Sequence, residues 1–337
     1  MNKFTHIGKA LGEAVLTTPT ADGKAGSWTA TQIRRPGVLE RTEMQHNDFP
    51  DTAYTTTWSN GRGEVRFFTR LDGSRLRYYT AGTGRPLVLL HTVRSQLDYF
   101  QRVIPRLWDH YTIYAMDLPG MGWSDIVPGA GYEEPELRAA VVEFASGLNL
   151  QDVTLAGESL GAALALSASI DLKDRVRQVV AFNSYDYPSG LERGNWLARF
   201  IITSVRMPGL GPVLAGLEPA PIMRAVLHGG FVDKSQLPED FLFELLRSGR
   251  RTGYSRVARA IYRSLEGFNR ARRRYPEVSI PVTLVYSDCD WSRPAERDQV
   301  ASALADVQRI TLPRTGHFSS LERPDDVARI LRRAGSP

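Results

Sequence analysis

The segment Val153-Thr154-Leu155-Ala156-Gly157-Glu158-Ser159-Leu160-Gly161 decides the fold of this chain. Its first four residues are typical of a buried strand, and the run AALALSAS that follows favours a helix. Gly157 and Gly161 let the backbone turn sharply between the two without a Cβ clash. A Gly-x-Ser-x-Gly segment between a strand and a helix is typical of a nucleophile elbow, which holds a serine hydroxyl exposed at the strand's end. We predict that Ser159 is a catalytic nucleophile and that the N–H of Leu160, where the helix begins, faces negative charge developing on a substrate.

A serine hydroxyl is a poor nucleophile until a base takes its proton, so this hypothesis requires a histidine later in the chain. Of the 6 histidines, His317 follows a strand-like run, stands in a tight Arg-Thr-Gly-His loop and precedes a final helical pattern. A carboxylate must then fix the tautomer of that histidine. Asp288 and Asp290 both follow the run PVTLVY. We predict Asp290 as the catalytic acid, because the strand must end and turn before a side chain reaches across, and Asp288 as a residue that caps the loop.

Strand-like and helix-like segments alternate on both sides of the elbow. Two alternating segments around 72–73 predict an antiparallel pair. Further strands are predicted at 86–90, 112–116, 153–156, 176–182, 282–286 and 307–312, and helices at 96–108, 133–147, 160–170 and 324–333. Such alternation predicts an α/β fold with a mainly parallel sheet covered by helices on both faces.

The strand pattern stops between 185 and 275, where helical patterns at 195–205, 238–247 and 254–274 predict an inserted cap. We therefore divide the chain into an N-terminal extension (1–61), a core (62–184 and 276–337) and a helical cap (185–275). Within the extension, apolar residues recur at helical spacing between 4 and 15. That face could touch a membrane or a partner, although packing on its own domain or disorder is the favoured interpretation.

Composition excludes several classes of protein. Lys plus Arg exceed Asp plus Glu by 42 to 37, a net charge of +5 with no dominating block, so no nucleic-acid partner is indicated. The single cysteine, Cys289, rules out an internal disulfide framework and a set of thiolates for zinc. No run of eighteen apolar residues occurs. We predict a soluble cytoplasmic protein that needs no metal or organic cofactor; the oligomeric state is left open.

The order Ser, Asp, His resembles that of the α/β-hydrolase superfamily over residues 62–337. The loop at 117–125 (DLPGMGWSD) is similar to the loop after the family's fourth strand, and 281–291 is similar to the segment that ends in its catalytic acid, with Ser287 where glycine is usual. The resemblance implies an eight-stranded sheet with a helical cap. It also implies that the backbone N–H of Val93 completes an oxyanion hole with that of Leu160.

The segment His91-Thr92-Val93-Arg94-Ser95 departs from the family's usual His-Gly. Threonine at position 92 resembles the plant hydroxynitrile lyases, whose threonine hydroxyl takes part in cyanohydrin cleavage. Arg94 either pairs with an anionic group of the substrate or ties its loop to a neighbouring acid. Apolar side chains of the cap, Trp196 and Phe200 among them, are expected to line a substrate cavity.

We therefore predict a serine hydrolase that cleaves a carboxylic ester of a medium-sized hydrophobic small molecule through an acyl-enzyme. A carbon–carbon bond hydrolase or a lyase with the same triad is an open alternative, and so is a binding protein without turnover. An aspartate at position 159 would indicate an epoxide hydrolase or a dehalogenase, and serine argues against both.

Overall fold

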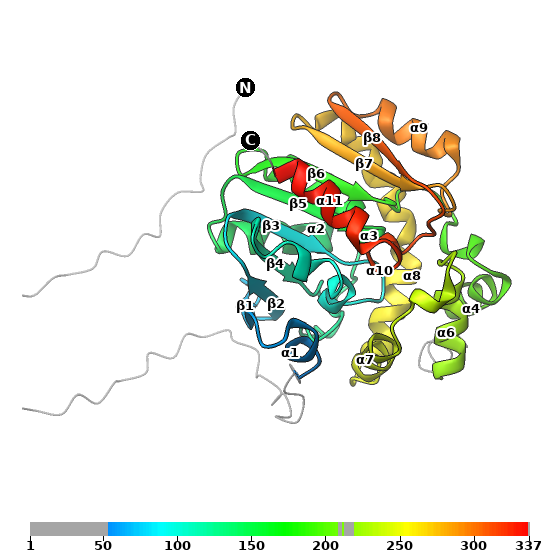
Figure 1. Cartoon of the computed structure of the whole chain (residues 1–337). Coiled ribbons are helices and arrows are strands. Elements are labelled where there is room, and N and C mark those ends of the chain that lie inside the picture. Colours follow the sequence, from blue (N-terminus) through cyan, green and yellow to red (C-terminus); the bar gives the residue numbers. More distant parts are fainter. Residues whose placement is uncertain (1–52, 208–210, 212–218, 336–337) are drawn as a thin grey trace, which may run out of the picture. The chain divides into compact units, whose positions relative to one another are not determined.

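A computed structural model describes residues 53–207, 211 and 219–335 of the chain, and an eight-stranded sheet runs through its centre (Figure 1). The strand order is β1-β2-β4-β3-β5-β6-β7-β8. β1 and β2 pair antiparallel, as do β2 and β4, and all other neighbours are parallel. The predicted fold class is confirmed. The strands are β1 (Glu64–Thr69), β2 (Arg75–Ala81), β3 (Arg85–Leu90), β4 (Tyr111–Met116), β5 (Val153–Glu158), β6 (Val176–Phe182), β7 (Val282–Ser287) and β8 (Val307–Leu312).

Two apolar clusters cover the two faces of the sheet, because successive side chains of a strand point to opposite faces. Along β3, Val88 and Leu90 belong to one cluster and Leu87 and Leu89 to the other. The first cluster includes side chains of α2 (Glu134–Gly147), α3 (Leu160–Asp171) and α9 (Pro294–Ser302). The second includes side chains of α11 (Pro324–Gly335). Helix α3 is buried from its first residue to Ser169, so the elbow lies at the centre of the core.

The segment 96–108 differs from its prediction as one helix. It forms two short 3-10 helices, η1 (Leu97–Phe100) and η2 (Ile104–Arg106). Pro105 lacks the N–H that a continuous α-helix would need, and its ring would clash with the carbonyl one turn earlier. In addition, the N–H of Leu97 donates to the Asp117 carboxylate at 2.7 Å, which fixes the start of the segment.

Helices fill the described chain between β6 and β7, and we call them the cap. They are α4 (Trp196–Arg206), α6 (Ala220–His228), α7 (Glu239–Gly249) and α8 (Tyr254–Ala271). They gather beyond the carboxyl ends of the parallel strands (Figure 1). Helix α8 packs one face on the core through Val257, Ile261 and Phe268.

The helix α1 (Ala53–Ser59) lies in the predicted extension but is bound to the core. Thr55 Oγ1 and Trp58 Nε1 both donate to Asp98 Oδ1, at 2.6 and 2.7 Å. Asp98 in turn pairs with the buried Arg77 at 2.8 Å. The described chain therefore joins the core earlier than the predicted boundary at residue 62. The predicted apolar face at 4–15 lies outside the described residues.

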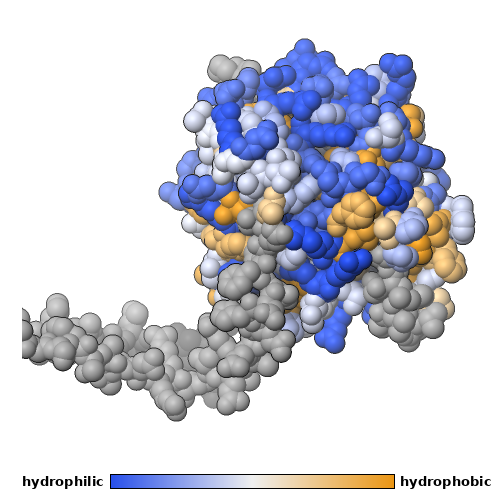
Figure 2. Space-filling model, turned by 60° about the horizontal axis from the view of Figure 1, so that its bottom comes forward, coloured by the Kyte–Doolittle hydropathy of each residue, from blue (hydrophilic) through white to orange (hydrophobic). Residues whose placement is uncertain are grey.

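Hydrophilic residues cover most of the face shown in Figure 2, and hydrophobic residues gather in separate patches. None of the helices in the described part of the chain has the length and apolar content needed to cross a membrane.

Candidate active site

The elbow between β5 and α3 holds Ser159 in a conformation that few residues adopt. Its φ of +59° and ψ of −119° lie outside the common regions for an L-residue. A Cβ on Gly157 would lie 2.4 Å from the carbonyl carbon of Gly161, and one on Gly161 would lie 2.1 Å from the Leu90 oxygen. Both glycines are therefore required by close packing at the turn. The Ser159 N–H donates to the Phe182 carbonyl at 2.9 Å, which anchors the turn to β6.

The structure brings the predicted triad together. His317 Nε2 lies 2.8 Å from Ser159 Oγ, and His317 Nδ1 lies 2.5 Å from Asp290 Oδ1. The side chains of His317 and Asp290 are fully buried, and Ser159 is fully buried as well. With the proton on Nδ1 donated to the carboxylate, Nε2 is left to accept the serine proton.

The two candidate carboxylates have separate roles in the loop after β7. The second oxygen of Asp290 accepts from the Ser292 N–H at 3.0 Å and from the Ser292 hydroxyl. Burial opposes its ionisation, but the charge of His317 and these hydrogen bonds together lower the pKa of Asp290. Asp288 instead accepts from the N–H groups of Arg314 and Thr315, at 2.8 and 3.1 Å. The structure thus places Asp290, and not Asp288, against the histidine.

Trp291 stacks on the imidazole of His317, a contact that the sequence analysis missed. The two ring centroids lie 3.8 Å apart with an interplanar angle of 14°. The indole Nε1 donates to the Gly229 carbonyl at 3.0 Å, just after α6. The position of Trp291 directly after Asp290 was visible in the sequence, but no periodic pattern connects it with a residue 26 positions later.

Glu158, the residue before Ser159, is buried and joins the elbow to the loop of the histidine. Its Oε1 accepts from the N–H and hydroxyl of Ser319 at 2.5 and 2.7 Å. Its Oε2 accepts from the N–H and hydroxyl of Ser320 at 3.1 and 2.5 Å. Burial raises the pKa of Glu158, and the hydrogen bonds from the two serines oppose that rise. We call this arrangement of Glu158, Ser319 and Ser320 the glutamate staple.

Asn183 makes a second connection between the strands that carry the site. Its Nδ2 donates to the His317 carbonyl at 2.9 Å and to Ser287 Oγ at 3.0 Å, while its Oδ1 accepts from the Ser287 N–H at 2.7 Å. A φ of +45° turns the chain at the end of β6 and aims this amide at β7. Ser287, which stands where the family usually has glycine, is therefore part of this network.

The loop after β3 lies beside the elbow, because Leu90 pairs with Gly157. The Leu118 N–H donates to His91 Nε2 at 3.0 Å, so His91 Nδ1 carries the proton and donates to the Thr92 carbonyl at 2.7 Å. That bond fixes the orientation of the peptide between Thr92 and Val93. In a trans peptide the Val93 N–H points away from the Thr92 carbonyl. Thr92 Oγ1 is buried and has no hydrogen-bond partner within the described chain.

Arg94 contacts cap residues. Its φ is +51°, its Nη1 donates to the Tyr262 hydroxyl at 3.2 Å, and its guanidinium lies over the rings of Tyr254 and Tyr262. These contacts are with tyrosines of α8, whereas the alternative left open by the sequence was a tie to a neighbouring acid. A narrow cavity of about 20 Å³ adjoins it, and it is lined by Arg94, Ala198, Ile201, Ile202, Ile222, Met223, Val226 and Tyr262.

Trp196 and Phe200 differ from their expected place. Trp196 is 79% exposed, Phe200 is 64% exposed, and neither lines the cavity beside Arg94. The reason is the geometry of α4, which buries the face of Ala198, Ile202 and Val205 and turns the opposite face to solvent. The expectation failed because apolar content alone does not say which face of a helix is buried.

The model of the alpha/beta hydrolase family matches residues 87–330, nearly three quarters of the chain. The chain belongs to the alpha/beta hydrolase family. The triad and the elbow described above lie within the matched residues. Within the described chain, no group of three or more His, Cys, Asp or Glu side chains is arranged to hold a metal ion.

Relatives in the alpha/beta hydrolase family include enzymes with different reactions. Haloalkane dehalogenase 2 of Mycobacterium tuberculosis is 24% identical over 298 residues, which are 81% of this chain and 95% of the relative. The 2-hydroxy-6-oxo-6-(2'-aminophenyl)hexa-2,4-dienoic acid hydrolase of Metapseudomonas resinovorans is 24% identical over 78% of this chain and 88% of its own. The crystal structure of Cfl2 from Burkholderia cenocepacia has a TM-score of 0.71 at 24% identity and covers 82% of this chain and 96% of Cfl2. That likeness shows the shared fold.

Proposed function

We propose that the protein is a serine hydrolase in which Ser159 is the nucleophile, His317 the general base and Asp290 the residue that orients the base. The observation that carries this proposal is the continuous hydrogen-bonded line from Ser159 Oγ through the imidazole to Asp290, with distances of 2.8 and 2.5 Å. Such a line lets the imidazole take the serine proton while the carboxylate stabilises the imidazolium that forms.

The reaction is an acyl transfer in two halves. As His317 takes the proton, the oxygen of Ser159 attacks the ester carbonyl, and the N–H groups of Val93 and Leu160 stabilise the oxyanion. His317 then protonates the leaving alcohol, and an acyl-enzyme remains. Water, deprotonated by the same imidazole, attacks the acyl-enzyme. The bond between the acyl carbon and Oγ then breaks, the imidazolium returns the proton to Ser159, and the carboxylic acid leaves. No step uses a metal or an organic cofactor.

The substrate we propose is an ester with a medium-sized hydrophobic acyl or ring group. This is supported by the aliphatic side chains of α4 and α6 that line the cavity beside Arg94. A cavity of about 20 Å³ is smaller than any such group, so we expect the cap helices to shift when substrate enters.

Serine at the elbow argues against the reaction of the dehalogenase relative. A carboxylate that displaces a halide, or opens an epoxide, forms an ester that water can hydrolyse. A serine oxygen in the same displacement would form an ether, which the base cannot release. The nucleophile therefore favours substrates with a carbonyl carbon.

A second candidate is hydrolysis of a carbon–carbon bond next to a carbonyl, or lyase chemistry, with the same triad. The relative from Metapseudomonas resinovorans is named as the hydrolase of a dienoic acid that carries a 6-oxo group. This relative favours carbon–carbon bond hydrolysis over lyase chemistry. The Thr92 hydroxyl is buried and has no partner among the described residues. It is therefore available to form a hydrogen bond with a substrate, which supports this second candidate.

The test uses a fluorophosphonate probe and a panel of p-nitrophenyl esters. We expect labelling and ester turnover in the wild type and the loss of both in Ser159→Ala. Labelling without ester turnover would move the assignment to the carbon–carbon hydrolase or the lyase. Well-folded protein that is not labelled would be a binding protein, and the hydrolase proposal would fail.

A further inference from the structure

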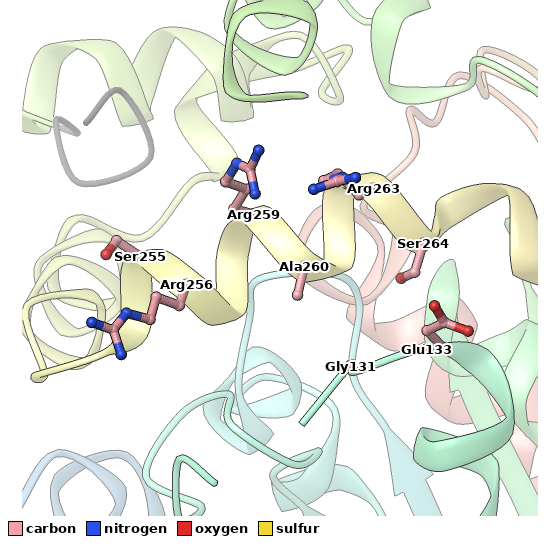
Figure 3. Close-up of a pocket in the computed structure, with 8 residues that line it drawn as sticks. All are labelled: Gly131, Glu133, Ser255, Arg256, Arg259, Ala260, Arg263 and Ser264. Atoms are coloured by element: carbon pink, nitrogen blue, oxygen red, sulfur yellow. The ribbon is translucent and has the colours of Figure 1, made fainter. Parts of the chain in front are cut away.

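A second and larger cavity lies outside the residues proposed for catalysis. Its volume is about 630 Å³, and it is lined by Gly131, Glu133, Ser255, Arg256, Arg259, Ala260, Arg263 and Ser264 (Figure 3). Most of these residues belong to α8, and the loop before α2 supplies the others. We call this cavity the arginine groove.

The arginine groove concentrates positive charge, because arginines outnumber acidic residues in its lining. Arg256, Arg259 and Arg263 form no ion pair with any residue that the structure describes. Other arginines of the molecule are paired, for example Arg274 with Asp171 at 2.9 Å. Glu133 is the single acidic residue in the lining.

A buried donor without a partner adds an independent observation. The Nε of Arg259 is buried and has no hydrogen-bond acceptor among the described residues. Removing such a donor from water without a partner costs free energy, and the cost is larger for a charged group. This Nε lies beside Gly211, so a ligand in the groove would meet the terminal N–H groups of the same guanidinium.

The spacing of the arginines indicates the size of the ligand. Figure 3 shows Arg259 and Arg263 extended on the same side of α8, with Arg256 about one turn earlier. At a rise of about 1.5 Å per residue, the helix carries these charges over roughly 10 Å. One oxyanion fits the pair at 259 and 263, and a second anionic group reaches toward 256.

We propose that the arginine groove binds a small polyanion, a molecule with two or more phosphate or carboxylate groups. The arginines line a hollow of this volume, which favours a small molecule over the surface of a lipid bilayer. This site does not depend on the proposed hydrolase reaction.

Isothermal titration calorimetry of the full chain with tripolyphosphate and with citrate tests the proposal. We expect one site per chain for at least one of the two anions, with an affinity that falls as salt is raised. Binding of tripolyphosphate alone would assign phosphate groups as the ligand chemistry, and binding of both would assign polyanions in general. Absence of binding by both would overturn the proposal.

Two double variants with the same change in net charge separate a site from general attraction. Arg256→Gln with Arg263→Gln removes two exposed charges from the groove, and Arg270→Gln with Arg273→Gln removes two exposed charges farther along the chain. We expect the first pair to weaken binding by about tenfold or more and the second to change it by less than about threefold.

Equal weakening in both pairs would overturn the site, and so would binding of anionic lipid vesicles with no binding of either small anion. Arg259→Met, which removes the buried donor, is expected to weaken binding as well. Fluorophosphonate labelling of each variant shows whether Ser159 still reacts, so failure of the groove and failure of the hydrolase proposal remain distinguishable.

Discussion

The residues of the proposed active site divide into those to which we assign the reaction and those that hold them in place. Asp290 and Asp288 are separated by one residue, yet one carboxylate contacts an imidazole and the other contacts two backbone amides. Sequence reasoning selected the first because a strand must end before a side chain can cross to its neighbour. In the structure each oxygen of Asp288 accepts from a backbone amide, of Arg314 or of Thr315, and it is Asp290 that contacts the imidazole.

The first prediction concerns the acid. Asp290→Asn keeps the shape of the side chain but presents an amide to Nδ1, so the imidazole is left in the wrong tautomer. We expect kcat on a p-nitrophenyl ester to fall by about 10³-fold or more. Asp288→Asn is the matched control, with an expected loss of less than about tenfold. The reverse ranking of the two variants would transfer the role to Asp288.

The second prediction uses pH and Asp288. Hydrogen bonds from the Arg314 and Thr315 amides lower the pKa of this carboxyl in the folded chain. A lowered folded pKa means that the ionised group contributes stability above its unfolded pKa, near 3.9, and that this contribution is lost as pH falls through the folded pKa. We expect wild type to be more stable than Asp288→Asn at pH 7 and the difference to shrink below about pH 4. Urea unfolding at several pH values measures it, and a constant difference would contradict the account.

At the scale of elements, the site depends on loops being held together at the carboxyl ends of β5, β6 and β7. The glutamate staple joins the elbow to the loop of His317, and Asn183 joins β6 to both β7 and that loop. Neither connection could be predicted, because each pairs residues more than a hundred positions apart without a periodic signal. The strands themselves were predictable: 176–182 and 307–312 agree with β6 and β8 residue by residue, since local hydrophobic pattern sets where a strand lies.

The third prediction tests the glutamate staple. Glu158→Ala leaves the amides and hydroxyls of Ser319 and Ser320 without their buried acceptor, so the histidine loop loses its tie to Ser159. We expect the rate of fluorophosphonate labelling to fall by about tenfold or more at a temperature where circular dichroism shows folded protein. Glu158→Gln, which keeps one acceptor oxygen, should recover part of the rate. Glu277→Ala, at an exposed glutamate, is the control and should react as wild type.

A purely structural role for Glu158 would lower the melting temperature without changing the labelling rate of the folded protein. That outcome would contradict the positioning role. If Glu158→Gln reacts no faster than Glu158→Ala, the acceptor oxygen is not what holds the loop.

At the scale of the whole molecule, the sequence predicted the class of fold and missed where the described chain joins the core. The segment at 53–59 lacks apolar alternation and was assigned to an extension. Its contacts are long-range, from Thr55 and Trp58 to Asp98 and from the Trp58 ring to Tyr79. Isolated long-range contacts of this kind leave no periodic trace in a sequence, whereas the buried strands do.

The fourth prediction compares two truncated chains, one that begins at residue 53 and one that begins at residue 61. The shorter chain removes two of the donors to Asp98, while the pair with Arg77 remains. Hydrogen bonds to a charged group contribute more to stability than neutral ones, so their loss is costly. We expect it to be less stable than the longer chain by about 2 kcal/mol or more in urea unfolding. Equal stability of the two chains would mean that α1 is not part of the core.

The fifth prediction asks which face of the cap selects the substrate. Met223 and Ile222 of α6 line the cavity beside Arg94. Trp196 lies on the exposed face of α4. Met223→Ala enlarges the cavity and so makes room for a longer acyl chain. We compare kcat/KM for p-nitrophenyl octanoate with kcat/KM for p-nitrophenyl acetate. We expect the octanoate-to-acetate ratio to rise by about tenfold, since each buried methylene contributes about 0.8 kcal/mol. Trp196→Ser is the control and should leave the ratio unchanged. A shift in Trp196→Ser without one in Met223→Ala would place the acyl group on the outer face of the cap.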